Sequence, residues 1–263
     1  MKSLAGKKIL VTGASNGLGM YLAIHIAMRG GEPILAARSS ERLKKLAEVI
    51  KVKFGGEVHW YCADLSRDEE WKSILMKIRD EQGPVDAVIN NAGIGRFSEV
   101  AESNWEDIEN MLSVNVTSVF RTTHHVLPEL LQHGKGHIVN IASQAGKMAT
   151  PKSAVYSASK HAVLGFTNAL RMEVKNQGVY VTSVNLGPVK TNFFTQADPS
   201  GTYQKAVERF MLDPNKVAHK IADSLFTPCR EINLPAWMNT GSKLYQLVPS
   251  AMEKLLESQF RKK

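Results

Sequence analysis

The chain has 263 residues, 43% of them hydrophobic, and a formal net charge of +8 with a pI near 9.4. A chain of this length can bury a full core, and one α/β domain is the simplest fit. The basic residues are scattered rather than gathered in dense runs, so we predict no nucleic-acid binding. A nucleotide cofactor or an anionic surface explains the charge at least as well.

Cysteine and histidine do not indicate a metal site. Cys62 and Cys229 lie in no cluster with metal-ligand spacing, so we predict buried thiols in a reducing compartment and no bound metal. The adjacent His124 and His125 point in different directions on a helix. Because no apolar stretch has the length of a signal-peptide core or a membrane span, we expect a cytoplasmic protein.

The first predicted elements are a strand, a glycine-rich loop and a helix. Residues 8–12 form a β-branched run, and residues 18–28 have helical apolar spacing. The loop between them has the pattern G-x-x-x-G-x-G and contains Gly13, Ser15, Asn16, Gly17, Leu18 and Gly19. Glycines let the backbone approach a pyrophosphate, and free N–H groups at a helix N-terminus attract anions. The alternative is an ordinary tight turn.

A second predicted strand, residues 33–37, leads into Arg38 and a helix over residues 41–53. In a Rossmann fold the residue that closes this strand faces the adenosine ribose, where an acid binds the 2′-hydroxyl and an arginine accommodates a 2′-phosphate. Arg38 offers a planar set of donors to phosphate, so the sequence favours NADP(H) over NAD(H). The alternative is an exposed arginine at the start of a loop.

The next two predicted strands also end in polar residues. After residues 58–62, Asp64 either binds an adenine amino group or caps the helix that begins near Asp68. After residues 85–89, the run Asn90-Asn91-Ala92-Gly93 suits both a turn and the floor of a cofactor site.

A long predicted helix over residues 105–133 carries Asn115 in an apolar stretch, where its amide needs partners such as a bound water. The fifth predicted strand, residues 137–141, is followed by Ser143. Open α/β sheets bind ligands at the carboxyl ends of their strands, so Ser143 is a candidate site residue. A serine at this position is as often a helix cap.

Tyr156 and Lys160 are expected on one face of the following helix, which continues to about residue 175, because side chains at i and i+4 are neighbours. A nearby ammonium favours the phenolate, so we expect the pKa of Tyr156 to fall from about 10 toward neutral. The pair therefore predicts that Tyr156 is a general acid/base.

Residues 179–184 form a sixth predicted strand. Six alternations of strand and helix predict an α/β fold with a Rossmann-type, doubly wound parallel sheet in a single domain. The polar segment that follows, with residues 198–201, is typical of a mobile loop that could close over a bound cofactor.

Taken together and in this order, these motifs resemble the short-chain dehydrogenase/reductase family over roughly residues 6–235. The resemblance implies a cofactor site made of Gly13, Ser15, Asn16, Gly17, Leu18, Gly19, Arg38, Asp64, Leu65, Asn91, Ala92, Gly93, Tyr156, Lys160, Val189 and Thr191. It also implies a homodimer or homotetramer.

The resemblance implies a division of labour among four catalytic residues, Asn115, Ser143, Tyr156 and Lys160. Tyr156 exchanges a proton with the substrate oxygen, and Ser143 donates a hydrogen bond to the same atom. Lys160 lowers the pKa of Tyr156 and binds the nicotinamide ribose. Asn115 anchors a water that links Lys160 to solvent.

The expected function is NADP(H)-dependent hydride transfer between the nicotinamide and a carbonyl or secondary alcohol. One alternative is reduction of a 3-oxoacyl thioester, whose anionic carrier suits the basic charge. The other is a catalytically silent NADP-binding regulator, which would have no need of Tyr156 as a proton donor. The aromatic residues Phe193 and Phe194 suit an apolar ketone or aldehyde.

The expected organisation is a dinucleotide-binding and catalytic domain over residues 1–235 and an amphipathic extension over residues 236–263. Residues 252–260 have helical apolar spacing, and the chain ends in three basic residues. The favoured interpretation is a helix packed on this subunit or on its neighbour. The alternative is peripheral membrane contact, with Trp237, Tyr245 and Phe260 inserted and the basic tail near anionic lipid.

Overall fold

The computed structural model describes residues 2–260 and contains a seven-stranded sheet in the order β3-β2-β1-β4-β5-β6-β7. All neighbouring strands are parallel. The strands are β1 (Lys8–Thr12), β2 (Glu32–Ala37), β3 (His59–Cys62), β4 (Ala87–Asn90), β5 (Gly136–Ile141), β6 (Val179–Leu186) and β7 (Glu231–Leu234). The predicted Rossmann-type parallel sheet is confirmed.

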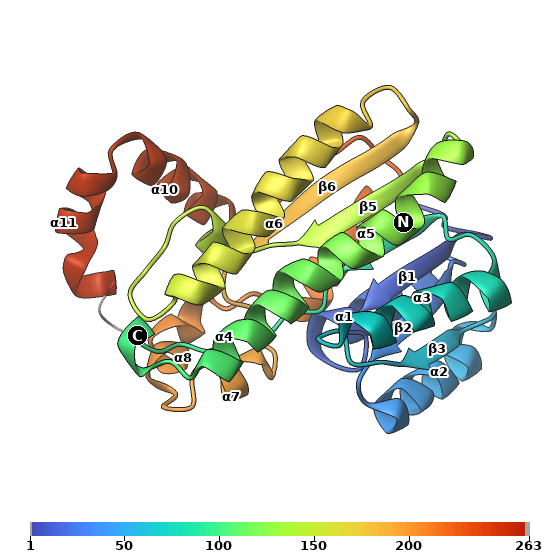
Figure 1. Cartoon of the computed structure of the whole chain (residues 1–263), viewed down its shortest axis with the longest axis horizontal. Coiled ribbons are helices and arrows are strands. Elements are labelled where there is room, and N and C mark those ends of the chain that lie inside the picture. The colour runs from blue at the N-terminus through green and yellow to red at the C-terminus, as the bar shows by residue number, and fades with distance from the viewer. Residues whose placement is uncertain (1, 261–263) are drawn as a thin grey trace.

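Helices cover both faces of the sheet (Figure 1). The α-helices are α1 (Gly17–Ala27), α2 (Ser40–Phe54), α3 (Asp68–Gln82), α4 (Trp105–Leu112), α5 (Ser118–Gln132), α6 (Ala154–Glu173), α7 (Phe193–Ala197), α8 (Thr202–Val207), α9 (Pro214–Ser224), α10 (Ala236–Leu247) and α11 (Pro249–Phe260). Short 3-10 turns are η1 (Val100–Glu102), η3 (Gln144–Gly146) and η4 (Glu208–Phe210), and η2 (Ser113–Thr117) is π-helical.

The strand β1 shows how the sequence divides the core into two layers. Ile9 and Val11 pack with α1, α2 and α9, whereas Leu10 packs with α3, α5 and α6. Successive strand residues point to opposite faces, so a continuous apolar run is what a strand buried on both faces requires. Strand order reverses around β1 and β4, and the crevice at their carboxyl ends is where such sheets bind ligands.

The predicted helix over residues 105–133 is interrupted. The π-helical segment η2 lies between α4 and α5 and contains the buried Asn115. Single π turns inside α-helices are often found at functional sites. Apolar spacing could not reveal this turn, because one extra residue barely changes the pattern over a long helix.

Two stretches differ in part from the prediction. Residues 198–201 form a loop as predicted, but the loop is short, lies between α7 and α8, and is held by the buried carboxylate of Asp198, which accepts hydrogen bonds from Ser200 Oγ (2.7 Å) and Gln204 N (2.8 Å). The strand β7 was missed because it has only four residues, of which one, Ile232, is buried and three are half-buried. The thiols are also not both buried: Cys62 is exposed and Cys229 is half-buried.

Beyond β7, the chain forms a helical hairpin of α10 and α11, shown in red at the left of Figure 1. The phenol of Tyr245 donates to Glu253 Oε1 (2.7 Å) and joins the two helices. Large apolar side chains stay exposed here, including Trp237 (56%), Leu247 (79%) and Leu255 (75%). Over residues 2–260, no helix combines the length and hydropathy that crossing a membrane requires. The proposed domain boundary at residue 235 stays a prediction.

Candidate active site

The glycine-rich loop is folded tightly against the end of β4. The side chain of Asn91 donates to the carbonyls of Thr12 (2.9 Å) and Gly13 (3.3 Å), and Thr12 Oγ1 accepts from the backbone N–H groups of Asn91 and Ala92 (both 3.0 Å). A Cβ on Gly19 would lie 2.2 Å from the Gly13 carbonyl oxygen, so only glycine fits there. Thr12 was not among the predicted site residues, although it directly precedes the loop.

The loop and the start of α1 fit a pyrophosphate. Gly13 and Gly17 have φ values of +66° and +52°, a conformation that side chains disfavour. The first turn of α1 has no acidic residue, and Asn16 makes no side-chain cap, so its N–H groups and positive dipole end remain suited to an anion. Ser15 and Asn16 lie at the surface of the loop, whereas Leu18 is buried in the core.

The segment after β6 reaches the same loop. A Cβ on Gly17 would lie 3.2 Å from Thr191 Cβ, so Thr191 closes directly over the start of α1. Val189 pairs with Leu212 in an isolated parallel bridge and packs against the core. The structure therefore brings predicted residues of the loops after β1, β4 and β6 close together at the carboxyl edge of the sheet.

Arg38 follows β2 and Asp64 follows β3, where the adenosine end of the cofactor site is expected. Arg38 is exposed at the end of β2, and its carbonyl accepts a hydrogen bond from Cys62 Sγ (3.2 Å). Burial opposes ionisation of Asp64, but hydrogen bonds from Ser66 and the charges of Arg38 and Arg67 lower its pKa. The carboxylate of Asp64 accepts hydrogen bonds from Ser66 N and Ser66 Oγ in a short turn before α3 and does not cap α3, so the capping alternative was wrong. Its neighbour Leu65 is buried in the core.

Asn115 fastens the loop after β4 to α6. Its Nδ2 donates to Ile94 O (2.9 Å) and Ser159 Oγ (3.0 Å), and its Oδ1 accepts from Ile94 N (2.8 Å). Gly93 lies between this side chain and Lys160, since a Cβ there would be 3.4 Å from Asn115 Oδ1 and from Lys160 Nζ. Because the amide N–H groups are used in these bonds, the water-anchoring role implied by the resemblance is left mainly to the main chain.

Ser143, Tyr156 and Lys160 converge at the carboxyl end of β5. The hydroxyls of Ser143 and Tyr156 are hydrogen-bonded to each other. Ser143 Oγ also lies 3.2 Å from the Leu186 carbonyl and accepts from Ala145 N (3.1 Å), so it caps η3 as well as facing the site. Lys160 Nζ donates to Ile141 O (3.0 Å) and lies 5.8 Å from the centroid of the Tyr156 ring.

The pKa of Tyr156 is not lowered, contrary to the prediction. Burial raises it to about 12, against a smaller opposing effect of the hydrogen bond with Ser143. Lys160 does not offset the burial, because its amine is directed to the Ile141 carbonyl and burial lowers its own pKa to about 8. The spacing of Tyr156 and Lys160 predicted that they are neighbours on one helix, but it contains no information about their burial.

An aromatic cluster covers Tyr156. Its ring centroid lies 5.9 Å from that of Phe97 and 5.7 Å from that of Phe193, and Tyr203 packs edge-on against Phe97 at 5.4 Å. The backbone N–H of Phe97 donates to Ala197 O (2.8 Å), which ties this cover to α7. Phe97 and Tyr203 were missed, because Phe97 lies on a loop and Tyr203 on the six-residue helix α8, which is too short to carry a periodic signal.

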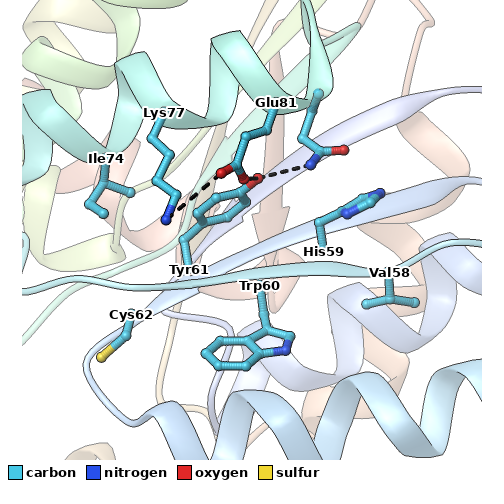
Figure 2. Close-up of a pocket in the computed structure, with 9 residues that line it drawn as sticks. Val58, His59, Trp60, Tyr61, Cys62, Ile74, Lys77 and Glu81 are labelled. Carbon is cyan, nitrogen blue, oxygen red and sulfur yellow. Dashed lines mark hydrogen bonds and ion pairs between the residues drawn. The ribbon is translucent and has the colours of Figure 1, made fainter.

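A separate groove of about 480 Å³ lies along the edge strand β3 (Figure 2). Tyr61 points into it and donates to Glu81 Oε2 (2.8 Å). The strands β2, β1 and β4 separate this groove from β5, and neither the glycine-rich loop nor Tyr156 lines it. It is therefore not the candidate active site. Within the described chain, no three His, Cys, Asp or Glu side chains are grouped as metal ligands.

The protein has a parallel sheet with a glycine-rich first turn, and Ser143, Tyr156 and Lys160 lie together at the carboxyl edge of that sheet. These features are typical of a dinucleotide-dependent oxidoreductase. Residues 7–200 match the family model for short chain dehydrogenases, and the chain belongs to the short-chain dehydrogenase/reductase family. It is an oxidoreductase of that family.

Similar proteins span most of the chain. An uncharacterized oxidoreductase of Staphylococcus saprophyticus is 34% identical over 228 residues, which are 87% of this chain and 94% of the relative. The ketoacyl reductase HetN of Nostoc sp. is 33% identical over 195 residues, covering 74% of this chain and 68% of its own. The structure of an alcohol dehydrogenase of Thermococcus sibiricus, complexed with 5-hydroxy-NADP, has a TM-score of 0.78 and 29% identity over 87% of this chain and 95% of that one.

Proposed function

We propose that the protein is an NADP(H)-dependent reductase of carbonyl compounds, with Tyr156 as the proton donor and the reverse alcohol oxidation as the same chemistry. The observation that carries the proposal is the hydrogen bond between the Ser143 and Tyr156 hydroxyls beside the buried Lys160. These groups stand at the edge of the sheet where the glycine-rich loop offers a pyrophosphate site.

When bound, the cofactor supplies the hydride. The residues of the chain supply position and a proton: Ser143 Oγ holds the substrate oxygen beside Tyr156 Oη, and Tyr156 gives its proton to that oxygen. A pKa of about 12 keeps Tyr156 protonated at neutral pH, which suits a proton donor and therefore reduction. Charged Lys160 stabilises the phenolate that remains.

The preference for NADP(H) rests on Arg38, which ends β2 in an exposed position, and on its electrostatic influence on Asp64. A guanidinium suits the 2′-phosphate, and no acid closes the strand to repel it. We expect Arg38→Asp to weaken NADPH binding far more than NADH binding in fluorescence titrations. Equal weakening of both cofactors would make Arg38 a structural residue and overturn the preference.

The substrate class we favour is an apolar aldehyde or ketone, because Phe97 and Phe193 pack against the Tyr156 ring and Tyr203 packs against Phe97, which gives the site aromatic surface. A 3-oxoacyl thioester is the second candidate, supported by the ketoacyl reductase among the relatives and by the net charge of +8. The complete Ser-Tyr-Lys set speaks against a silent regulator, which would retain cofactor binding without needing a proton donor.

The test is NADPH oxidation by the purified full-length protein against aldehydes, ketones, diketones and 3-oxoacyl thioesters, with Tyr156→Phe measured in parallel. Turnover that disappears in the variant supports the reductase, and the best substrate separates the two substrate classes. NADPH binding without turnover across the panel would contradict the reductase and favour the regulator.

The remaining proposals concern location and assembly. We propose a cytoplasmic homodimer or homotetramer, by analogy with the family. The hairpin of α10 and α11 covers either this subunit or a neighbour, or it contacts a membrane surface through the exposed Trp237, Leu247 and Leu255. Truncation after Val248 distinguishes these: reduced cosedimentation with anionic liposomes supports membrane contact, and a changed oligomeric state at unchanged liposome binding supports packing on a neighbour.

A further inference from the structure

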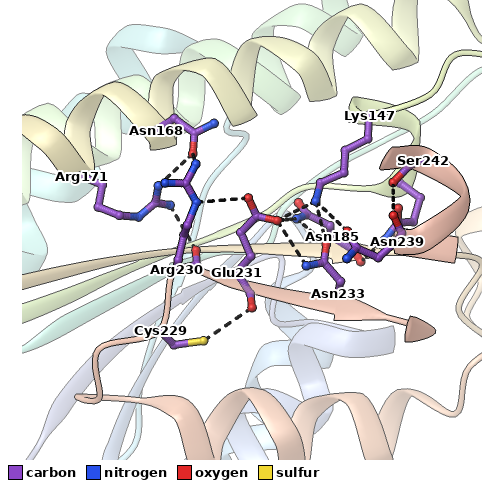
Figure 3. A network of polar contacts seen from close by, with 11 residues as sticks. Lys147, Asn168, Arg171, Asn185, Cys229, Arg230, Glu231, Asn233, Asn239 and Ser242 are labelled. Atoms are coloured by element: carbon purple, nitrogen blue, oxygen red, sulfur yellow. Dashed lines mark hydrogen bonds and ion pairs between the residues drawn. The ribbon is translucent and has the colours of Figure 1, made fainter. Parts of the chain in front are cut away.

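A largely half-buried polar cluster lies where η3, β6, β7 and α10 meet (Figure 3). We call it the Lys147 cluster, and it consists of Lys147, Asn185, Glu231, Asn233 and Asn239. Lys147 Nζ donates to Glu231 Oε2 (2.6 Å), Asn233 Oδ1 (2.9 Å) and Asn239 Oδ1 (3.1 Å). Only 11% of the Lys147 side chain is exposed, so its charge depends on these oxygens.

The other members of the Lys147 cluster bind one another. Asn185 Nδ2 donates to Asn233 Oδ1 (2.9 Å) and to Glu231 Oε2 (3.3 Å), and Asn233 Nδ2 donates to the same carboxylate oxygen (3.2 Å). Burial opposes ionisation of Glu231, but hydrogen bonds from Lys147 and Asn233 and the charges of Lys147 and Arg230 lower its pKa. Lys147 and Glu231 are therefore a paired charge rather than two neutral groups.

The Lys147 cluster is linked to the candidate active site through η3. Ser143 and Gln144, at the start of this turn, bind consecutive carbonyls of β6: Ser143 Oγ lies 3.2 Å from Leu186 O, and Gln144 Nε2 lies 3.1 Å from Asn185 O. At the other end of the turn, a Cβ on Gly146 would lie 2.7 Å from Lys160 O. A shift of η3 would therefore move the Ser143 hydroxyl relative to α6, which carries Tyr156.

Two buried atoms in and beside the cluster show that it is not arranged for stability alone. Asn185 Oδ1 and Gln144 Oε1 have no hydrogen-bond partner within the part of the chain that the structure describes. Buried acceptors without partners cost free energy, and proteins keep them mainly where function requires the residue. An apolar contact between η3 and β7 would hold the turn without the free-energy cost of desolvating charges, but it would fix the orientation of the turn less strictly.

We propose that Lys147 is a positioning residue for catalysis, which fixes the turn that carries Ser143 by binding β7 and, through Asn239, the helix α10. This inference rests on the proposed function, since it assigns Lys147 to the same site. It also connects the C-terminal hairpin to the chemistry. Contact between α10 and the site is supported at a second point, where a Cβ on Gly187 would lie 2.6 Å from Met238 Sδ.

The test uses the full-length protein and the variants Lys147→Met and Asn239→Leu. We expect Lys147→Met to lower kcat roughly tenfold or more and to leave the KM for NADPH within about twofold, because the glycine-rich loop keeps its contacts. Asn239→Leu should lower kcat in the same way but less, since it removes one of three partners of the ammonium. Lys7→Met is the matched control: it removes a 2.7 Å ion pair with Asp86 at the opposite end of the sheet and should leave kcat unchanged.

Lys147→Met removes the nearer of the two cations that pair with Glu231 and leaves Arg230 Nε at 3.6 Å from Glu231 Oε1, so the double variant Lys147→Met/Glu231→Gln is measured as well. If the single variant folds poorly, the double variant should fold and still show the loss of kcat. Variants with a lower Tm but a wild-type kcat and KM would overturn the inference, because the cluster would then only stabilise the fold.

Hydrogen exchange separates this inference from the proposed function. The amides of residues 146–148 are held by the carbonyls of Ser143 and Gln144 at 2.9–3.0 Å. In Asn239→Leu they should exchange roughly tenfold faster than in the wild type, even if no substrate in the panel turns over. Absent wild-type turnover contradicts the reductase. Unchanged exchange in these amides contradicts the coupling of α10 to the turn.

Discussion

Titratable side chains are buried at both ends of β5, but their surroundings differ. At the amino end, both ring nitrogens of His137 are paired: Nδ1 accepts from Phe226 N (3.0 Å), so Nε2 donates to Thr182 Oγ1 (2.9 Å). At the carboxyl end, Lys160 is buried beside Ser143 and Tyr156. Burial lowers both pKa values, that of His137 to about 3 and that of Lys160 to about 8.

The difference indicates that the amino end of β5 is arranged for stability, whereas the carboxyl end is arranged for chemistry at a cost in stability. His137 is buried as a neutral, fully hydrogen-bonded ring, so the amino end of β5 maintains the sheet. Near the carboxyl end, Gln144 Oε1 is buried without a hydrogen-bond partner among residues 2–260, and the amine of Lys160 is buried close to the phenol of Tyr156. Substitutions at the carboxyl end should therefore change activity, and substitutions at the amino end should change stability.

A first test at the carboxyl end is the variant Ser143→Ala. We expect kcat to fall roughly a hundredfold or more at a nearly unchanged Tm, because the variant removes a hydrogen bond to the reacting oxygen. Ser183→Ala is a matched control, since Ser183 Oγ is buried on β6 without a hydrogen-bond partner among the described residues. The control should keep full activity and stability. A loss of kcat no larger than that of the control would remove Ser143 from the mechanism.

A second test concerns the glycine-rich loop at the same edge of the sheet. In Gly19→Ala the new Cβ would meet the Gly13 carbonyl oxygen at 2.2 Å and Asn91 Nδ2 at 2.7 Å, so the loop must shift. We expect NADPH affinity, measured by fluorescence titration, to fall on the order of ten- to a hundredfold. Gly165→Ala in α6 meets nothing within 4 Å and should bind NADPH normally. Normal NADPH binding by Gly19→Ala would exclude this loop from the cofactor site.

A third test concerns the dependence of stability on pH at the amino end of β5. The pKa of His137 is about 3 in the folded protein and 6.5 in its ordinary state, so only the unfolded chain takes up the proton between these values. Its contribution is complete above pH 6.5 and is lost at about 1.4 kcal/mol per pH unit as the pH falls. Urea unfolding of His137→Gln should lack this part of the slope, and His124→Gln, at an exposed position, should keep it. Equal slopes for all three proteins would show that His137 does not control the acid sensitivity.

Much of the fold and of the candidate site could be predicted from the sequence, because local patterns determine these parts. The run at residues 8–12, the glycines of the first loop and the spacing of Tyr156 and Lys160 each predicted a structure that was found. The carboxyl-edge position of Ser143 followed from the order of the elements alone.

The parts that could not be predicted depend on contacts between distant segments. The direction of the Tyr156 pKa shift is set by burial, to which the distant Phe97 and Phe193 contribute by packing on the Tyr156 ring. Lys147 finds its partners 84 to 92 residues away, two of them on the strand β7, which was itself missed, and the third on α10. Spacing along one helix contains no information about such desolvation or such pairs.

The most direct test of the central claim is the pH dependence of single-turnover hydride transfer from NADPH, in the wild type and in Tyr156→Phe. We expect the wild-type rate to be constant at neutral pH and to fall above about pH 8, where Lys160 loses its proton before Tyr156 does. The variant should bind NADPH normally and transfer hydride roughly a thousandfold more slowly at every pH. A variant as fast as the wild type, with the same pH profile, would show that Tyr156 is not the proton donor.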